Sequence, residues 1–447
     1  MHCRDMSTSF SDIEEIRKLR YGVHNADLDI GVGGEDRLTR NVSDSDSVRR
    51  QNRGLILGAL RSGGPQSRTA LAGITGLSHA SVTAIMQDLL AQRIVEELTS
   101  HERTDGRMRG RPATLVGFRR AAAYVALFEI DVNRLRASLV DYSGVLVDRI
   151  ETAISPSTFA ETPPGGFFAA HLDSLRGRTP QAVRTLRRIA ISVQGILNPD
   201  NSGLKWSPIA SLAGSSFAHD LSRDSGLPVA LYKRGRLLAE GTRWLDPGLL
   251  QSSVATVFVG STVAMGLSLH GHITGRSEGG ATEFGHMNHM PNGALCRCGM
   301  RGCIEAYAAD YGILRTSYSV PETTPPAPSV PAQQFDALIQ RAEAGDRDAT
   351  HGFNLAGRAI GYGLSRMMAM FDPSHILIVG PGARALHLFR PEVEAALSSS
   401  LVCKINGLPK ILAHPDEREP IFRGLMMKTL STLDQTDFAA LETGSRV

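Results

Sequence analysis

Three cysteines and one histidine crowd into a short segment of the second half of the chain, and they constrain its fold more than any other feature. Cys296, Cys298 and Cys303 fall within eight residues, and His286 lies shortly before them. Three thiolates and one imidazole are the donors that a closed tetrahedral zinc site needs. The segment must therefore fold back on itself so that four separated side chains can meet.

Two glycines make this closure possible. Gly299 and Gly302 lie between the second and third cysteines, where a backbone without Cβ atoms can turn sharply. The alternatives are cysteines that meet in a turn by chance, and a zinc hydrolase. A hydrolase keeps one coordination position open for water, and three cysteines with one histidine leave none. The sequence predicts a structural zinc ion held by His286, Cys296, Cys298 and Cys303.

The spacing of these residues resembles a family motif. Glu283-Phe-Gly-His286, followed by Cys296-Arg-Cys298-Gly-Met-Arg-Gly-Cys303-Ile-Glu305, is similar to the zinc motif of the ROK family, which contains both transcriptional repressors and sugar kinases. The resemblance covers residues 48–440. It implies an α/β fold: an N-terminal winged helix-turn-helix plus a two-lobed actin-like, hexokinase-like (RNase H-type) α/β domain.

Composition limits the class of protein. A length of 447 residues suggests two to four domains, and a net charge of +3 identifies no partner by itself. Five cysteines, three of them assigned to a metal, do not form a disulfide framework. We find no apolar run of membrane-spanning length and no secretory signal, so we expect a soluble cytoplasmic protein without a membrane span.

Composition also divides the chain. We expect a disordered or weakly ordered extension over residues 1–47, with one short helix around Ser11–Tyr21. Apolar runs that alternate with helical patterns from Ala121 onward are typical of α/β domains. Residues 318–331 are rich in proline and predict a surface loop. The predicted domains are a DNA reader at 48–118, and a sensor and dimerisation domain at 119–440 with its zinc loop near 283–305, before a tail at 441–447.

The predicted DNA reader begins with three helices, at Arg50–Ser62, Arg68–Thr75 and His79–Gln92. Ser67 and Ser78 can cap the second and third helices through their hydroxyls, and Gly76 supplies the turn between them. In the third helix, four apolar residues at helical spacing predict a buried face: Val82, Ile85, Met86 and Leu89. The opposite face carries short polar side chains that suit a DNA major groove: Ser78, His79, Ser81, Thr83 and Gln87.

A basic hairpin follows the third helix. Ile94–Leu98 and Pro112–Val116 read as its two strands, and residues 101–120 hold six arginines. Gly110-Arg-Pro-Ala113 resembles the end of the wing in ROK-type repressors. Guanidinium groups on such a wing contact phosphates or enter the minor groove, so the predicted contacts are Arg107, Arg109 and Arg111. The alternative is a small helical packing domain with a solvated basic loop.

The family that this chain resembles also contains kinases, and their phosphate loops and catalytic base can be compared with this sequence. The first loop would read Asp-x-Gly-Gly-Thr, but the chain has Asp131-Val132-Asn133, which disfavours phosphate by charge and shape. The second, Gly260-Ser-Thr262-Val-Ala264-Met-Gly266, has lost two inner glycines. The segment 371–382 resembles a strand and glycine turn near adenine in the kinases, and we interpret it as structural.

The catalytic segment shows a third loss. After Leu227-Pro-Val, the aspartate expected as general base falls at Tyr232 and the preceding asparagine at Leu231. A phenol with a reference pKa of about 10 is a poor base at neutral pH. A shifted alignment is the alternative. Because three separate elements are lost, we predict a protein that is not an enzyme.

The resemblance implies that an effector meets Glu283, His286 and Glu305, since their positions match residues that contact sugar hydroxyls in the family. The alternative is that the two glutamates merely orient the zinc loop. Lys233, Arg234 and Arg236 lie near the lost catalytic segment, and either recognise an anionic ligand or are solvated surface charges.

These features predict a transcriptional regulator, most simply a repressor, of carbohydrate-related genes. Its partners would be a double-stranded DNA operator, a sugar or sugar-phosphate effector, and other copies of itself in a homodimer or homotetramer. Effector-linked closure of the lobes would change the spacing of the reader helices. The competing hypotheses are an ATP-dependent sugar kinase with a DNA-binding domain, and a DNA-binding protein without an effector.

Overall fold

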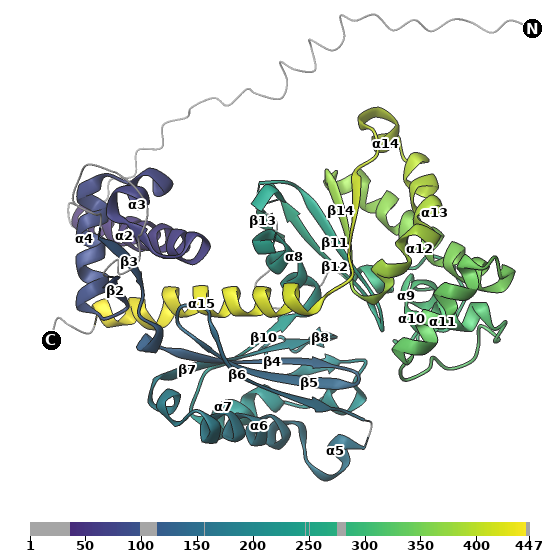
Figure 1. The fold of residues 1–447 in the computed structure, drawn as a ribbon, viewed down its shortest axis with the longest axis horizontal. Helices are drawn as coiled ribbons and strands as arrows, with labels where there is room; N and C mark the ends of the chain where they lie inside the picture. The colour runs from purple at the N-terminus through teal and green to yellow at the C-terminus, as the bar shows by residue number, and fades with distance from the viewer. Residues whose placement is uncertain are drawn as a thin grey trace, which may run out of the picture. The chain divides into compact units, whose positions relative to one another are not determined.

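The computed structural model describes residues 36–98, 114–155, 157–245, 247–249, 251–274 and 283–443 (Figure 1). The chain divides into two compact units, residues 1–51 and 52–447. The first described element, α2 (Asp36–Gly63), extends the predicted helix Arg50–Ser62 toward the N-terminus. Residues 36–47, which we expected in a disordered extension, are therefore helical. The predicted helix Ser11–Tyr21 lies outside the described residues.

Two short helices joined by a tight turn follow, as predicted. The Ser67 hydroxyl caps α3 (Arg68–Thr75) by accepting from the Ala70 N–H, and Ser78 caps α4 (His79–Ala91) by accepting from the Ser81 N–H. Gly76 ends α3 in the left-handed conformation, with a φ of 70°. The two helices are bent by 119°, within the range of helix-turn-helix units. Local capping alone thus fixes both helix starts.

A small antiparallel sheet completes this region, in the order β1-β3-β2. Its strands are β1 (Gln66–Ser67), β2 (Val95–Leu98) and β3 (Leu115–Phe118). The pairing of β2 with β3 confirms the predicted hairpin, although the return strand begins at Leu115 rather than at Pro112. Among the described helices, none is long and apolar enough by itself to span a membrane, and only α3 and α4 taken together pass that test of length and composition.

The first lobe is a five-stranded sheet in the order β10-β7-β4-β5-β6. β4 pairs antiparallel with β5 and parallel with β7, which pairs parallel with β10. The strands are β4 (Tyr124–Asp131), β5 (Arg134–Asp141), β6 (Leu146–Ala153), β7 (Leu186–Val193) and β10 (Val229–Lys233). Outside the sheet lie α5 (Thr158–Glu161), α6 (Pro164–Arg178), α7 (Phe217–Ser225), and the short pair β8 (Ile196–Leu197) and β9 (Leu204–Trp206).

The second lobe repeats this topology in the order β13-β12-β11-β14-β15. Its central strand also has one antiparallel neighbour, β12, and one parallel neighbour, β14. The strands are β11 (Val254–Val259), β12 (Val263–Leu269), β13 (His272–Ile273), β14 (His375–Val379) and β15 (Lys410–His414). The helices are α9 (Glu305–Ala308), α10 (Asp310–Ser317), α11 (Ala332–Glu343), α12 (Arg347–Phe371), α13 (Leu386–Ser398) and α14 (Leu401–Asn406). The repeated order confirms the predicted two-lobed α/β fold.

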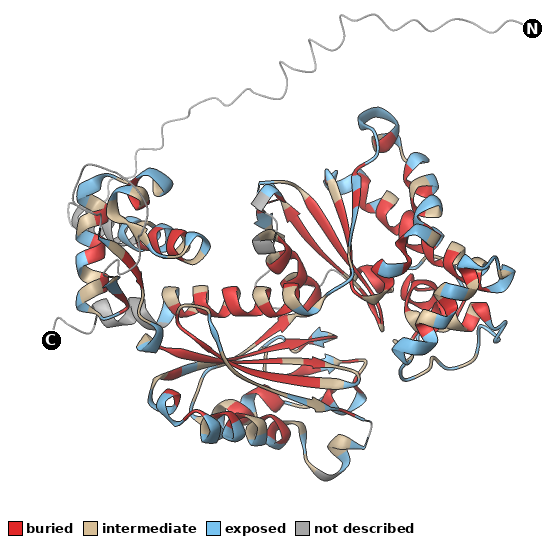
Figure 2. Cartoon of the chain, viewed as in Figure 1, coloured by how far each residue is buried: buried red, intermediate tan, exposed pale blue. Residues whose placement is uncertain are grey.

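Two helices connect the lobes, because each follows a strand of one sheet and packs on the other sheet. α8 (Arg234–Leu245) follows the last strand of the first sheet and packs on β11 and β12 of the second. α15 (Arg418–Thr443) follows the last strand of the second sheet and packs on β4 and β7 of the first. The two helices also pack against each other, and their inward faces are buried (Figure 2). Each sheet is therefore completed by a helix from the other half of the chain.

Glycines allow α8 and α15 to approach closely. A Cβ atom at Gly241 would lie 1.8 Å from the carbonyl oxygen of Pro420, and one at Gly424 would lie 2.1 Å from that of Leu237. Real Cβ atoms do not approach backbone this closely, so any side chain at these positions forces the helices apart. The crossing point is thus set by backbone contact.

Candidate effector pocket and metal centre

The structure brings the four predicted metal ligands together. The imidazole nitrogen of His286 and the Sγ atoms of Cys296, Cys298 and Cys303 all lie within 4.8 Å of one another. The Cys296 Sγ to His286 Nδ1 distance and the Cys298 Sγ to Cys303 Sγ distance are both 3.7 Å. A tetrahedron with zinc–sulfur bonds of about 2.3 Å has edges of about 3.8 Å. The thiols are free, and their spacing fits shared coordination of one ion.

The glycines close the loop as the sequence predicts. Gly299 and Gly302 have φ values of 87° and 79°, in the left-handed region. A Cβ atom at Gly302 would lie 1.7 Å from the carbonyl oxygen of Met290. The folded loop is held by bonds such as the one from the Cys296 N–H to the Met300 carbonyl, 2.9 Å. Backbone geometry therefore places Cys303 beside the earlier sulfurs.

The three thiols influence one another's ionisation. Hydrogen bonds from Cys296 and Cys303 lower the pKa of the Cys298 thiol, while Cys296 and Cys298 raise that of Cys303. Burial works to lower the pKa of His286, but its bonds with Cys296 and Cys298 outweigh burial and raise it to about 11. A divalent ion would replace these shared protons, and three sulfurs with one imidazole suit zinc.

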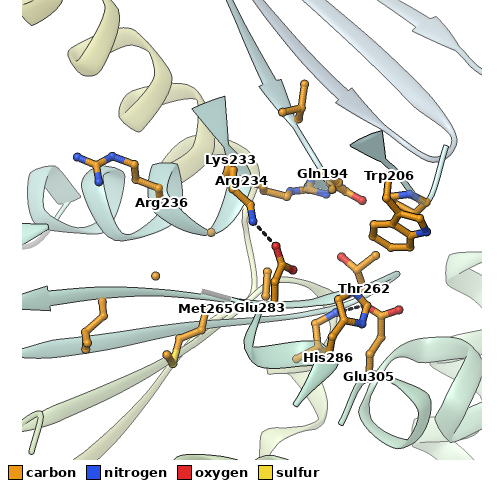
Figure 3. A pocket seen from close by; sticks show the side chains of 18 of the residues that line it. Gln194, Trp206, Lys233, Arg234, Arg236, Thr262, Met265, Glu283, His286 and Glu305 are labelled. Atoms are coloured by element: carbon orange, nitrogen blue, oxygen red, sulfur yellow. Dashed lines mark hydrogen bonds and ion pairs between the residues drawn. The ribbon is translucent and has the colours of Figure 1, made fainter. Parts of the chain in front are cut away.

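A cavity of about 70 Å³ lies beside this centre and takes residues from both lobes (Figure 3). All three predicted effector residues line it, so the structure brings Glu283, His286 and Glu305 together. Trp206 faces His286 edge-on across the cavity wall, with a centroid distance of 5.3 Å. Sequence reasoning missed Trp206 and Gln194, because the first lobe supplies them from segments without a motif.

The two glutamates have different partners. Glu283 accepts a short hydrogen bond from the ammonium group of Lys233. Glu305 is buried, and its carboxylate accepts from the Val263 N–H at 3.1 Å and the Tyr311 hydroxyl at 3.3 Å. Burial and the nearby Cys296 raise the pKa of Glu305 to about 7. Glu305 therefore orients the loop around the metal centre, whereas Glu283 lies at the cavity wall in an ion pair.

Three basic residues that follow Tyr232 also line the cavity. Lys233, Arg234 and Arg236 come from the end of β10 and the start of α8. Arg234 is 7% exposed, so the alternative of a solvated surface charge is wrong for this residue. Its guanidinium pairs with Asp131 at 3.1 Å and lies over the ring of Phe258, 4.7 Å from the centroid. Arg234 thus connects the two lobes.

Tyr232 does not line the cavity. Its ring is buried on the far side of β10, and its hydroxyl lies 3.4 Å from Thr432 Oγ1 in α15. Leu231 is buried in the first-lobe core. Successive strand residues point to opposite faces, so Leu231 and Tyr232 pack on the two faces of the sheet. The residues that reach the cavity come later in the segment. The residues of this segment that line the cavity are Lys233 and Arg234, neither of which is a carboxylate.

The two phosphate-loop positions serve other contacts. Asp131 accepts from the Val132 N–H at 2.7 Å and from Gln194 Nε2 at 3.1 Å. Burial works to raise the pKa of Asp131, but Arg234 and these hydrogen bonds outweigh it and lower the pKa. A Cβ atom at Gly260 would lie 2.7 Å from the ring of Phe258. The first turn presents a carboxylate that is paired with an arginine, and the second turn is packed against an aromatic ring.

A second carboxylate faces the same region. Asp310 and Asp131 both line a neighbouring cavity of about 210 Å³, together with Gly260 and Ser261. Burial raises the pKa of Asp310 to about 7, and the carboxylates of Asp131 and Glu305 add to this effect. Arg134, Arg384 and Arg418 line the same cavity, so its wall carries charges of both signs.

The predicted reader helix has the expected two faces. Val82, Ile85, Met86 and Leu89 are buried. On the other face, Ser78, His79 and Gln87 are exposed, whereas Ser81 and Thr83 are half-buried. Ala80 and Ala84 are also exposed, and sequence reasoning missed them because it sought only polar side chains. Arg107, Arg109 and Arg111 lie outside the described residues.

These two lobes, their cavity and the Cys/His centre define a class of protein, and comparison with known proteins identifies it. The chain matches the ROK family over residues 128–419. It belongs to the ROK family.

Individual relatives extend the match toward the N-terminus. The xylose repressor of Bacillus subtilis is 22% identical, over 83% of this chain and 94% of the repressor. A ROK family transcriptional regulator, a homolog of the E. coli MLC protein, has a similar structure with a TM-score of 0.69 and 20% identity, covering 88% and 99% of the two chains. A Streptomyces griseus ROK glucokinase gives a TM-score of 0.52 at 18% identity and covers 68% of this chain.

Proposed function

We propose that this protein is a DNA-binding transcriptional repressor of carbohydrate-related genes that responds to a sugar or sugar-derived effector and has no kinase activity. The observation that carries the proposal is the cavity wall where β10 meets α8: its side chains are the cations Lys233 and Arg234, and the wall carboxylate Glu283 is paired with Lys233 rather than free to act as a base. The repressor names among its relatives support the same function. Their matches cover 83% and 88% of this chain, against 68% for the glucokinase.

The DNA contact is assigned to α4 and the basic hairpin. The exposed side chains of α4 would enter a major groove, with polar atoms from Ser78, His79, Ser81, Thr83 and Gln87 and the methyl groups of Ala80 and Ala84 against bases. Arg107, Arg109 and Arg111 would contact phosphates or the minor groove. Two copies in a homodimer would read two half-sites of an operator, which makes a winged helix-turn-helix dimer the proposed DNA-bound form.

The metal is proposed to be a structural zinc ion. His286, Cys296, Cys298 and Cys303 would fill four positions, which leaves none for a water nucleophile. When bound, the ion supplies a fixed positive charge that keeps three thiolates together. The loop then holds Glu283 and His286 against the cavity, while Glu305 anchors the first residue of β12.

A buried network is proposed to carry the effector signal to the DNA reader. The guanidinium of Arg61 in α2 pairs with Asp434 in α15 at 2.9 Å and donates to the Tyr142 carbonyl at 2.9 Å. It also lies over the rings of Phe118 and Tyr142, at 4.3 and 4.7 Å. Because α15 packs on α8, which begins at the cavity, a shift of α8 would reach Arg61 through one helix.

Operator binding tests the first part of this proposal. We expect Gln87→Ala to weaken binding to a genomic operator by about 10- to 100-fold, the loss of one good base contact. Gln334→Ala, exposed on the distant helix α11, is the matched control and should bind normally. Equal binding by both variants would count against α4 as the reader.

Two further measurements test the rest. ATP-dependent phosphorylation of any sugar in a panel, abolished in Lys233→Ala, would overturn the absence of kinase activity. Asp434→Asn should leave the cavity intact yet reduce the effect of a bound effector on operator affinity. An unchanged effector response in that variant would remove Arg61 and Asp434 from the signal path.

A further inference from the structure

One segment of the first lobe is rich in arginine, and two of its side chains are left free. Residues 174–199 hold five arginines and no carboxylate. Arg184, in the short 3₁₀ helix η2 (Pro180–Thr185), and Arg187, at the start of β7, are both exposed. Within the described part of the chain, neither guanidinium has an ion-pair or hydrogen-bond partner. Both groups are therefore available to an anion from outside the chain.

The local backbone turns Arg187 toward solvent. At this point β7 carries one residue more than its neighbour β4, between Leu186 and Arg188, so the strand forms a bulge. A bulge of this kind re-aims the side chain of the extra residue. Leu186 is buried in the first-lobe core, and Arg188 donates to Thr436 Oγ1 in α15 at 3.0 Å. The sheet thus uses both neighbours internally and presents Arg187 outward.

Two more arginines continue this surface toward the predicted DNA reader. Arg93 is exposed in the turn between α4 and β2, and Arg119 follows β3. The Arg119 N–H donates to the carbonyl of Ile94 at 3.0 Å, so the two arginines lie at the same end of the hairpin. The next element, η1 (Arg120–Ala122), packs on η2. We call these residues the arginine strip: Arg93, Arg119, Arg184 and Arg187.

Carboxylates on the adjoining elements are mostly neutralised by other arginines. Asp141 is paired with Arg120 at 2.5 Å, and Asp434 is paired with Arg61 at 2.9 Å. Glu96 is exposed on β2. The strip therefore keeps an excess of positive charge. Fixed cations in a row suit a polyanion with closely spaced charges, and duplex DNA carries one negative charge per about 1.7 Å.

We propose that the arginine strip binds phosphates of the DNA that flanks the operator core, as a second DNA contact made by the first lobe. This inference rests on the proposed DNA-binding function and extends it beyond α4 and the hairpin. The thirteen residues of α4 separate its reading end at Ser78 from Arg93 by about 20 Å. The strip therefore meets flanking phosphates rather than the bases that α4 reads, and the duplex curves toward the first lobe to reach it.

Operator duplexes of two lengths test this contact with the full, zinc-loaded chain. One duplex holds the operator core alone, and the other adds about two helical turns, about 20 base pairs, on each side. In the strip variant, Arg184→Gln with Arg187→Gln, we expect the affinity for the long duplex to fall at least about tenfold at about 0.1 M salt. The slope of log affinity against log salt should fall by at least about 1.8, since each lost phosphate contact removes about 0.9. Binding of the core duplex should not change.

A charge-matched variant controls for the loss of two positive charges. Arg347→Gln with Lys404→Gln removes the same charge from exposed positions in α12 and α14 of the second lobe. This variant should bind the long duplex as the native protein does. Energy transfer between dyes at the two ends of the long duplex should fall in the strip variant and persist in the control, because the curvature depends on the strip.

The outcomes separate this inference from the proposed function. Unchanged binding of the long duplex by the strip variant overturns the flanking contact and leaves the arginines to an acidic protein or lipid surface. An equal loss on both duplexes, or an equal loss in the charge-matched control, overturns it as well. The repressor itself is overturned only if the unmodified protein fails to bind the operator core.

Discussion

The two lobes share one strand order but differ at the turn that follows the first strand of each. In the first lobe the turn between β4 and β5 contains Asp131, whose carboxylate binds Arg234 from the start of α8. In the second lobe the turn between β11 and β12 begins with Gly260, packed on the Phe258 ring. Phe258 also lies under Arg234. Both turns are parts of one contact between the lobes, so the same sheet topology presents a paired carboxylate in one lobe and a packed glycine in the other.

The lobes differ also in what stabilises them. The second carries the proposed metal centre and a core that reaches into its loop through Cys296 and Cys303. The first has no metal cluster among the described residues and is covered by α15 from the other end of the chain. This asymmetry predicts that the lobes respond to different perturbations.

Metal loss should give the largest effect and should strike the second lobe. Cys298→Ser, or chelation of the native protein, removes a site whose binding energy in small domains is about 10 to 16 kcal/mol, comparable with the total stability of a domain. We expect hydrogen exchange in β11 and β12 to become fast while β4 and β5 stay protected. The control Cys403→Ser, a buried cysteine outside the cluster, should retain metal and protection. Uniform unfolding of both lobes would erase the proposed asymmetry.

The helix crossing should give the next largest effect. Gly424→Ala places a Cβ atom 2.1 Å from the Leu237 carbonyl, so α15 must move away from α8 at a cost of about 3 kcal/mol. Chemical denaturation measures this loss. Gly177→Ala in α6 has open space and should be neutral or stabilise by up to about 1 kcal/mol. Equal stability of the two variants would show that the crossing is not set by backbone contact.

The smallest effect concerns pH. The pKa of Asp310, about 7, lies above its ordinary value, so the stability that this group provides is present below about pH 4 and is lost as the pH rises through 7. Asp310→Asn removes that loss. We expect the variant to gain about 1 to 2 kcal/mol over the native protein between about pH 5 and pH 8, because water in the adjoining cavity screens part of the charge. A constant difference across this range would contradict the buried carboxylate.

Local chemistry made much of the fold predictable. Ser67, Gly76 and Ser78 act through neighbours within four residues, so the starts of α3 and α4 follow from the sequence. The Cys-rich loop followed from Gly299 and Gly302. The Pro-rich loop and the β14 strand lie where we expected them. Each of these features depends on backbone preferences that operate over a few residues.

Contacts between distant segments could not be predicted. Asp131 and Arg234 are 103 residues apart, and Arg61 and Asp434 are 373 apart, so no spacing rule joins them. The contact of Tyr232 with α15 could not be predicted either, because a motif match does not define which face of a strand a side chain occupies. The helical start of α2 at Asp36 was missed because polar composition masks helices that lack an apolar stripe.

The exchange of helices between the lobes has a consequence for biosynthesis. The sheet formed by β4 to β10 is complete as a set of strands once about half of the chain has left the ribosome, but α15 is among the last segments to emerge. Leu425 and Leu430, which are fully buried with Val125 and Tyr142, must wait for that helix. The nascent chain therefore carries an uncovered apolar face between the synthesis of β10 and that of α15, and a premature stop before Arg418 leaves that face without its own cover.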